Sequence, residues 1–223
     1  MAEKYTIAVD GPVGAGKSTL ARLVAKKLNI IYVDTGAMYR AVGLYAIRNG
    51  VELTDRTGIV ALLPQIELDV KIVNNEQQVF LNGEDVTGLI RTPEISMAAS
   101  VVSKIAEVRT KLVELQRKLA DRVSVIMDGR DIGTVVLPNA STKIYLTASL
   151  DVRAKRRYNE LITKGQDVTF EDVKADIMKR DDNDMNRDVS PLRPAEDSVN
   201  LDTSDMTLDE AVDAIIRIAS EKA

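Results

Sequence analysis

The residues that most clearly indicate chemistry form a glycine-rich run near the start of the chain. Residues 11–18 match the pattern G-x-x-x-x-G-K-[ST]. Glycines let successive backbone N–H groups turn inward around an anion, and a following helix would direct its positive end at the same point. In such a loop the lysine reaches the β- and γ-phosphates, and the hydroxyl of the next residue can ligate Mg²⁺. We therefore assign ATP binding to Gly11, Pro12, Val13, Gly14, Ala15, Gly16, Lys17, Ser18 and Thr19, with Ser18 as the metal ligand.

The elements on either side of this run are those that a phosphate-binding loop requires. Residues 5–9 form a short apolar stretch typical of a buried strand, and residues 17–28 have the apolar spacing of a helix. A second strand is predicted at 30–33, and a helix follows from Thr35 to about Arg48. The order strand, loop, helix, strand, helix is typical of a parallel sheet covered by helices. A glycine-rich turn beside a surface lysine would not need this order.

The remaining elements change character along the chain. Residues 66–73 alternate between apolar and polar types, as residues 78–81 do in part, with turn residues at 74–75 and 82–83. This predicts a small antiparallel sheet inserted in the fold. Two helices are predicted over 93–120, strands at 123–127, 143–146 and 199–201, and helices at 151–163 and 170–180. Residues 181–197 are polar and contain two prolines, which predicts a mobile loop, and Thr207 to Glu210 form a capping box that begins a last helix.

The composition restricts the possible chemistry. The 223 residues include no cysteine and no histidine, which excludes a disulfide framework, Cys/His zinc sites and histidine-based triads. Phosphoryl transfer fits what remains, because it depends on positioning and charge stabilisation. A net charge of −4 argues against nucleic acid as a partner. The sequence has no signal peptide and no apolar run long enough to cross a membrane, so we expect a cytoplasmic protein with no membrane partner, and a monomer by default.

Arginines recur near the predicted loops and helix starts. Each one alone would be expected on the solvated surface. Beside a phosphate-binding loop they predict a second phosphate site and a closing lid, because guanidinium groups bind phosphate oxygens in pairs and a lid excludes water. No N-K-x-D motif for guanine recognition is present, and the D-x-x-G matches at 55–58 and 85–88 fall in predicted turns. The arginines in question are Arg40, Arg109, Arg130, Arg153, Arg156, Arg157, Arg180 and Arg187.

Three blocks of sequence together resemble the bacterial cytidylate kinase family. They are Asp34-Thr35-Gly36-Ala37-Met38-Tyr39-Arg40, Asp128-Gly129-Arg130-Asp131-Ile132-Gly133-Thr134 and the run from Arg180 to Arg187. The resemblance covers nearly the whole chain and keeps the motifs in order. Thr35 departs from the family pattern, where serine is common, but it keeps the hydroxyl group. The blocks at 128–134 and 180–187 are more specific to the family than the phosphate-binding loop.

The resemblance implies an α/β fold with a five-stranded parallel sheet, helices on both faces, an inserted antiparallel lobe that binds the nucleoside monophosphate, and a helical lid. It places the core at 1–60, 93–150 and 198–223, the insertion at about 61–92 and the lid at about 151–190. The implied activity transfers the γ-phosphate of ATP to CMP or dCMP, with Mg²⁺.

The resemblance also implies a role for each site residue. Thr35, Arg40 and Arg130 would hold the acceptor phosphate, and Ser100, Arg109 and Asp131 would bind the cytosine. Arg180 and Asp184 would contact the sugar, with Arg187 nearby. Arg153, Arg156 and Arg157 would act from the lid, with Arg156 toward ATP. The implied catalytic set is Lys17, Arg130, Asp131, Arg153 and Arg157.

Several alternatives stay open from the sequence. Another P-loop kinase with a small acceptor, such as UMP, AMP, shikimate or gluconate, shares most of these features. A non-catalytic ATP-binding regulator would share the loop but leave the arginines unexplained. Asp131 could cap a helix or orient Arg130 instead of binding a base, and Asp128 could either order a Mg²⁺ shell or pair with an arginine.

Overall fold

A central parallel sheet organises the protein. The computed structural model describes residues 5–73 and 76–222, so the predicted turn at 74–75 lies outside the described residues. The sheet has the strand order β2-β6-β1-β7-β8, and every neighbouring pair is parallel. This confirms the predicted five-stranded sheet. The strands are β1 (Thr6–Asp10), β2 (Ile31–Asp34), β6 (Val125–Gly129), β7 (Thr142–Thr147) and β8 (Val199–Asp202).

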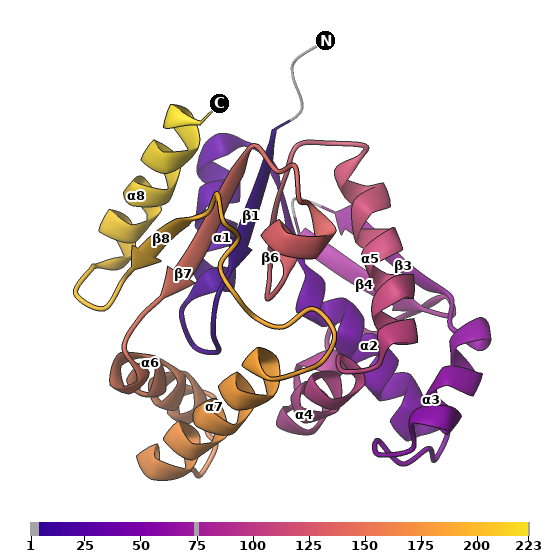
Figure 1. Cartoon of the computed structure of the whole chain (residues 1–223). Coiled ribbons are helices and arrows are strands. Elements are labelled where there is room, and N and C mark those ends of the chain that lie inside the picture. Colours follow the sequence, from indigo (N-terminus) through magenta and orange to yellow (C-terminus); the bar gives the residue numbers. More distant parts are fainter. Residues whose placement is uncertain (1–4, 74–75, 223) are drawn as a thin grey trace.

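Helices cover both faces of this sheet, as predicted (Figure 1). Successive side chains of β1 point to opposite faces, so Ile7 and Val9 pack in one apolar cluster and Ala8 in another. The Ile7 side lies against α1 (Lys17–Leu28) and α8 (Leu208–Glu221). The Ala8 side lies against α2 (Thr35–Arg48), α4 (Pro93–Val102) and α5 (Ala106–Ala120).

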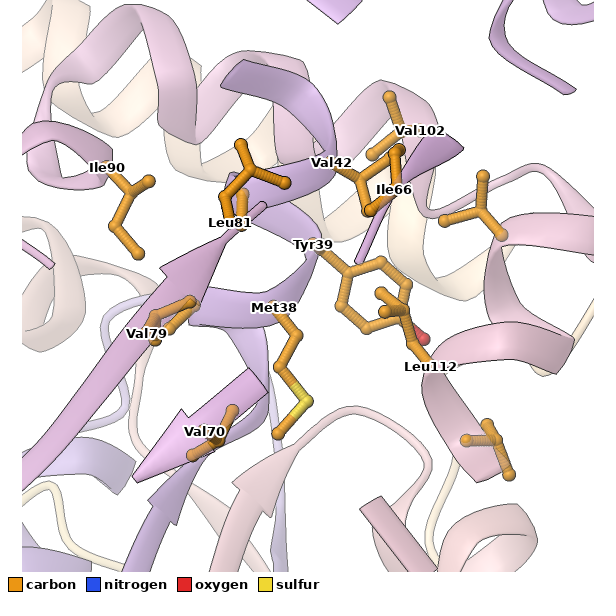
Figure 2. Close-up of a cluster of buried hydrophobic side chains, with 14 of the residues drawn as sticks. Met38, Tyr39, Val42, Ile66, Val70, Val79, Leu81, Ile90, Val102 and Leu112 are labelled. Atoms are coloured by element: carbon orange, nitrogen blue, oxygen red, sulfur yellow. The ribbon is translucent and has the colours of Figure 1, made fainter. Parts of the chain in front are cut away.

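A small antiparallel sheet packs on α2. It contains β3 (Leu68–Val73), β4 (Glu76–Leu81) and the short β5 (Glu84–Asp85). Figure 2 shows its buried side chains, including Val70, Val79 and Leu81, beside Met38 of α2. The predicted antiparallel lobe is thus confirmed, and β5 is an addition to it.

The segment between α2 and this sheet contains a helix that the sequence did not predict. This helix is α3 (Arg56–Leu62). It is followed by a short 3₁₀ turn, η1 (Leu63–Gln65). The Asp55 carboxylate accepts a hydrogen bond from the Gly58 N–H at 2.9 Å, so the D-x-x-G match at 55–58 is a helix start and not a turn. The second match does lie in a turn, because Asp85 accepts from the Thr87 N–H. It leads to the 3₁₀ turn η2 (Leu89–Arg91).

Two antiparallel helices extend beyond the carboxyl ends of the strands, where the lid was predicted (Figure 1). They are α6 (Leu150–Thr163) and α7 (Phe170–Met185). The prediction that a loop begins at Asp181 was wrong, because α7 continues to Met185 and buries Asp181 and Asp184 against arginines. One turn of π-helix, η3 (Ile132–Val136), follows β6. Among the described residues, no helix is both long and apolar enough to span a membrane.

Candidate functional site

A cavity of about 1030 Å³ lies at the carboxyl ends of the strands. This is where open parallel α/β sheets bind ligands. Its walls come from the loop before α1, the first turn of α2, the residues after β6, and helices α4, α5, α6, α7 and α8. Most of the predicted site residues line it, namely Val13, Gly14, Gly16, Lys17, Ser18, Thr19, Thr35, Arg40, Ser100, Arg109, Arg130, Asp131, Arg156, Arg157, Arg180, Asp184 and Arg187.

The glycine-rich loop has a backbone that side chains would not permit. Gly16 caps α1 with a φ of 91°, in the left-handed region that favours glycine. Gly11 approaches β7 so closely that an added Cβ atom would lie 2.0 Å from the Leu146 carbonyl oxygen. Gly14, Gly16 and the first residues of α1 line the cavity, so the positive end of this helix lies where an anion would bind.

The Lys17 ammonium lies inside this loop. Its Nζ donates to the Pro12 carbonyl at 2.7 Å, and the residue is only 6% exposed. Burial, followed by the nearby Arg130 guanidinium, lowers the pKa of Lys17 to about 7. A phosphate group at this point would add negative charge beside the ammonium group and raise the pKa of Lys17 again.

Asp128 joins three polar side chains at the end of β6. Its carboxylate accepts from the Ser18 hydroxyl at 2.7 Å and from the Tyr32 hydroxyl at 2.9 Å. Its backbone carbonyl accepts from the Thr35 hydroxyl at 2.7 Å. Burial and the nearby Asp34 carboxylate raise the pKa of Asp128. Within residues 5–73 and 76–222 no arginine pairs with Asp128, so the ion-pair alternative is wrong for this structure.

Asp131 and Arg109 form a buried ion pair that faces the cavity. Their side chains are 7% and 4% exposed, and Arg109 also donates to the Ser103 carbonyl at 3.2 Å. Arg187 lies on the other side of Asp131, at 3.9 Å. The Asp131 side chain does not cap η3, and Arg130 has a different partner, so neither structural alternative for Asp131 applies. The pair presents a carboxylate and a guanidinium side by side.

Asp184 lies beside two arginines, Arg130 after β6 and Arg187 just beyond the end of α7. It accepts from Arg130 at 2.6 Å and lies 3.7 Å from Arg187. Burial alone would raise the pKa of Asp184, but the guanidinium groups of Arg130, Arg187 and Arg180 together hold that pKa below its ordinary value. Arg180 lies 3.8 Å from Asp176, and its buried Nε has no hydrogen-bond partner. Arg180 itself lines the cavity.

The start of α2 contributes a further arginine. Arg40 donates to the Asp34 carboxylate at 2.7 Å, while its buried Nε has no hydrogen-bond partner. Ser100 of α4 lines the same cavity. The structure thus brings Arg40 and Ser100 to one cavity with Arg109 and Arg130, although long stretches of sequence separate them.

The three arginines of α6 differ in their surroundings. Arg156 donates to the Thr203 carbonyl at 2.7 Å, and Arg157 donates to Glu160 at 2.7 Å; both line the cavity. Arg153 is not among the residues that line it. Instead it is buried and donates to the carbonyls of Val13 and Ala148, at 2.8 and 2.9 Å, and to the Asp181 carboxylate at 2.6 Å.

Two buried aspartates that support the site were not predicted. Asp181 accepts from the Val13 N–H at 3.0 Å as well as from Arg153, so this pair holds both polar groups of one loop residue. Asp10 accepts from the N–H groups of Ile132 and Gly133, each at 2.7 Å, and burial raises its pKa to about 6. A carboxylate at the end of a buried strand was the signal for Asp10, whereas no local signal marked Asp181.

The comparison with known proteins agrees with this geometry. A model of the family described as cytidylate kinase matches residues 7–221. The chain belongs to the cytidylate kinase family. The cytidylate kinase of Caldicellulosiruptor bescii is 51% identical over 97% of this chain and 96% of its own length. That of Bacillus subtilis is 47% identical over the whole of both chains.

Two solved structures with low sequence identity to this chain show similarity of fold alone. An uncharacterised protein from Eubacterium ventriosum has a TM-score of 0.53 at 14% identity, covering 98% of this chain and 99% of its own. A sugar kinase from Janibacter has a TM-score of 0.50 at 14% identity, covering 99% of each chain. The cytidylate kinase assignment therefore depends on the sequence relatives and the site.

Proposed function

We propose that this protein transfers the γ-phosphoryl group of ATP to CMP or dCMP, giving ADP and CDP or dCDP. One observation carries the proposal. A phosphate-binding loop and the buried pair of Asp131 and Arg109 open into a single cavity, with further arginines between them. The loop suits a nucleoside triphosphate, and the pair suits the polar edge of a base.

The paired side chains match cytosine. Cytosine has an amino group at N4, from which the Asp131 carboxylate can accept, and acceptors at N3 and O2, to which Arg109 can donate. Uracil has a carbonyl in place of the amino group. Asp131 would then face a second acceptor in a buried site, which costs free energy. The arrangement therefore favours CMP over UMP, with Ser100 as a further contact to the base.

The sugar and the acceptor phosphate lie between the base and the loop. Arg180 and Asp184 contact the sugar, and Arg187 supports them. Arg40 and Arg130 hold the phosphate through their guanidinium groups, and Thr35 supports them from the first turn of α2. The Thr35 hydroxyl already donates to the Asp128 carbonyl, so its contribution is to place the first turn of α2.

The reaction needs no general base, because the acceptor phosphate oxygen is already deprotonated near neutral pH. That oxygen attacks the γ-phosphorus in line, and a new P–O bond forms as the bond to the β,γ-bridging oxygen breaks. Lys17 and Arg130 stabilise the negative charge on the transferring group. Arg156 and Arg157 on α6 complete the positive surroundings, while Arg153 acts on the shape of the loop.

The oxygen ligands present are those that suit Mg²⁺. The Ser18 hydroxyl and the Asp128 carboxylate lie 2.7 Å apart beside the loop. Mg²⁺ in phosphotransferases is held by few protein oxygens together with phosphates and water. Ser18 would be a direct ligand and Asp128 would orient it. When bound, the ion supplies positive charge to the β- and γ-phosphates.

Asp131→Asn tests the base assignment. The variant replaces one acceptor by an amide that can donate to the uracil carbonyl. We expect the ratio of kcat/KM for CMP to that for UMP to fall by about 10- to 100-fold, the worth of one buried polar mismatch. This ratio does not depend on the fraction of folded enzyme. An unchanged ratio would remove Asp131 from base recognition.

A further inference from the structure

The strand β4 places one polar side chain on an otherwise apolar face. Side chains alternate along a strand, so Gln77, Val79 and Leu81 share the face that lies toward α2. Val79 and Leu81 are buried there against Met38, as Figure 2 shows. Gln77, at the end of the row, is only half-buried and lies beside the edge strand β2.

The Gln77 side chain binds both backbone polar groups of Asp34, the last residue of β2. Its side-chain oxygen accepts from the Asp34 N–H at 2.7 Å, and its side-chain nitrogen donates to the Asp34 carbonyl at 3.1 Å. Among the residues that the structure describes, β2 pairs with β6 alone, so its other edge has no neighbouring strand in the sheet. At the last residue of β2, the Gln77 side-chain amide thus makes the two backbone hydrogen bonds that a neighbouring strand would otherwise make.

Asp34 in turn controls the first turn of α2. Its carboxylate accepts from the Ala37 N–H at 3.0 Å, which caps the helix, and from Arg40 at 2.7 Å. The side chains of Arg40 and Asp34 are 20% and 16% exposed, so this ion pair is well shielded from water. The direction of the Arg40 guanidinium therefore depends on the place of Asp34.

We propose that Gln77 is a positioning residue for the acceptor-phosphate subsite. Through the Asp34 backbone it fixes the end of β2, and through the Asp34 carboxylate it fixes Arg40, whose buried Nε has no hydrogen-bond partner. The inference rests on the proposed function, in which Arg40 holds the acceptor phosphate. It gives the antiparallel lobe a second task beyond packing, because a lobe residue sets the geometry of an arginine in the core.

Gln77→Leu is the variant of choice. Leucine matches the apolar neighbours on the same face of β4, and it can neither donate nor accept. Gln78→Leu is the matched control, because Gln78 is the next residue on the opposite face. Gln77→Glu keeps an acceptor for the Asp34 N–H but places a second acceptor against the Asp34 carbonyl, so it tests the need for the donor at that carbonyl.

The measurement is the Kd for CMP and for cytidine, by calorimetry, in each variant. Loss of the contacts in Gln77→Leu is expected to raise the Kd for CMP about tenfold, and the Kd for cytidine by less than about twofold, because cytidine lacks the phosphate. Gln77→Glu should weaken CMP binding at least as much as Gln77→Leu, because the glutamate sets an acceptor against the Asp34 carbonyl and adds a negative charge near the phosphate. Gln78→Leu should leave both constants unchanged.

The outcomes separate the inference from the function beneath it. An equal loss for CMP and cytidine, or no loss for either, in Gln77→Leu would overturn the positioning role. Arg40→Ala is measured in parallel. If Arg40→Ala leaves CMP binding unchanged, the phosphate subsite itself is wrong, and the proposed function fails at that point together with the inference. If Arg40→Ala weakens CMP binding and Gln77→Leu does not, the inference alone is wrong.

Discussion

The buried pair of Asp181 and Arg153 gives a prediction about stability. Asp181→Ala removes the acceptor for the Val13 N–H, at 3.0 Å, and for Arg153, at 2.6 Å. Asp181 and Arg153 are each 8% exposed, so the substitution leaves Arg153 as a buried charge without its counterion. Breaking a buried pair in this way costs about 3–5 kcal/mol. Arg153 keeps two carbonyl partners, so we expect about 3 kcal/mol.

Urea unfolding without nucleotide measures this loss. A protein of this size should also lose about 6–12 °C in Tm, at about 2–4 °C per kcal/mol. Asp182→Ala is the control, because Asp182 is the next residue of α7 and is exposed. Its effect should stay within about 0.5 kcal/mol. The double variant Arg153→Met with Asp181→Leu removes both charges and should recover part of the stability that Asp181→Ala loses.

Two results would refute this reasoning. A loss below about 1 kcal/mol for Asp181→Ala would mean that the pair is as weak as a surface ion pair. A double variant less stable than Asp181→Ala would mean that packing and the bonds of Arg153 to the Val13 and Ala148 carbonyls outweigh the uncompensated charge.

Three further predictions concern the site. Lys17→Ala should lower kcat by about 100- to 1000-fold with an unchanged circular dichroism spectrum; near-normal turnover would remove Lys17 from the reaction. Burial raises the pKa of Asp10 from 3.8 to about 6, so the folded state binds the extra proton between these values and stability falls as pH rises through them. In Asp10→Asn, the decrease in the free energy of unfolding between these pH values should be smaller by about 3 kcal/mol. Urea unfolding from about pH 4 to 7 measures this decrease in both proteins, and parallel curves of stability against pH would contradict the prediction. Tyr32→Phe removes the hydroxyl that donates to Asp128 at 2.9 Å, and should raise the Mg²⁺ concentration needed for ATP binding about tenfold in calorimetric titrations; an unchanged Mg²⁺ dependence would contradict a role for Asp128 beside the ion.

The elements with an uninterrupted apolar pattern could be predicted from the sequence. The strand before the phosphate loop and the helix after it are examples, since their buried residues are all close in the chain. The alternation of β3 and β4 predicted the antiparallel lobe in the same way. The elements that the sequence did not predict are short, such as the two residues of β5 and the seven of α3.

The end of α7 shows why the length of a longer helix was also predicted incorrectly. Its buried face runs through Val173, Ile177, Asp181 and Asp184 at helical spacing. Asp181 and Asp184 are charged, so the apolar spacing that predicts a helix stops at Ile177, although the helix continues to Met185. Their burial is stabilised by Arg153 and Arg130, which lie 28 and 54 residues away in sequence. Local sequence carries no information about partners at that distance.

Separation along the sequence also decides which features of the site could be predicted. The types of the site residues were expected from the motifs, and the structure brings most of them to one cavity. Their partners were not expected. The pairing of Asp131 with Arg109, and the contact of Gln77 with Asp34, both join elements that only the folded sheet brings together.

The release of ADP from ATP in the presence of Mg²⁺ tests the central claim most directly, with CMP, dCMP, UMP, AMP, shikimate or no acceptor added to the purified protein. The account predicts strong stimulation by CMP and dCMP, weak stimulation by UMP, and little release without an acceptor. Equal release with and without CMP, or stimulation by a different acceptor alone, would contradict it.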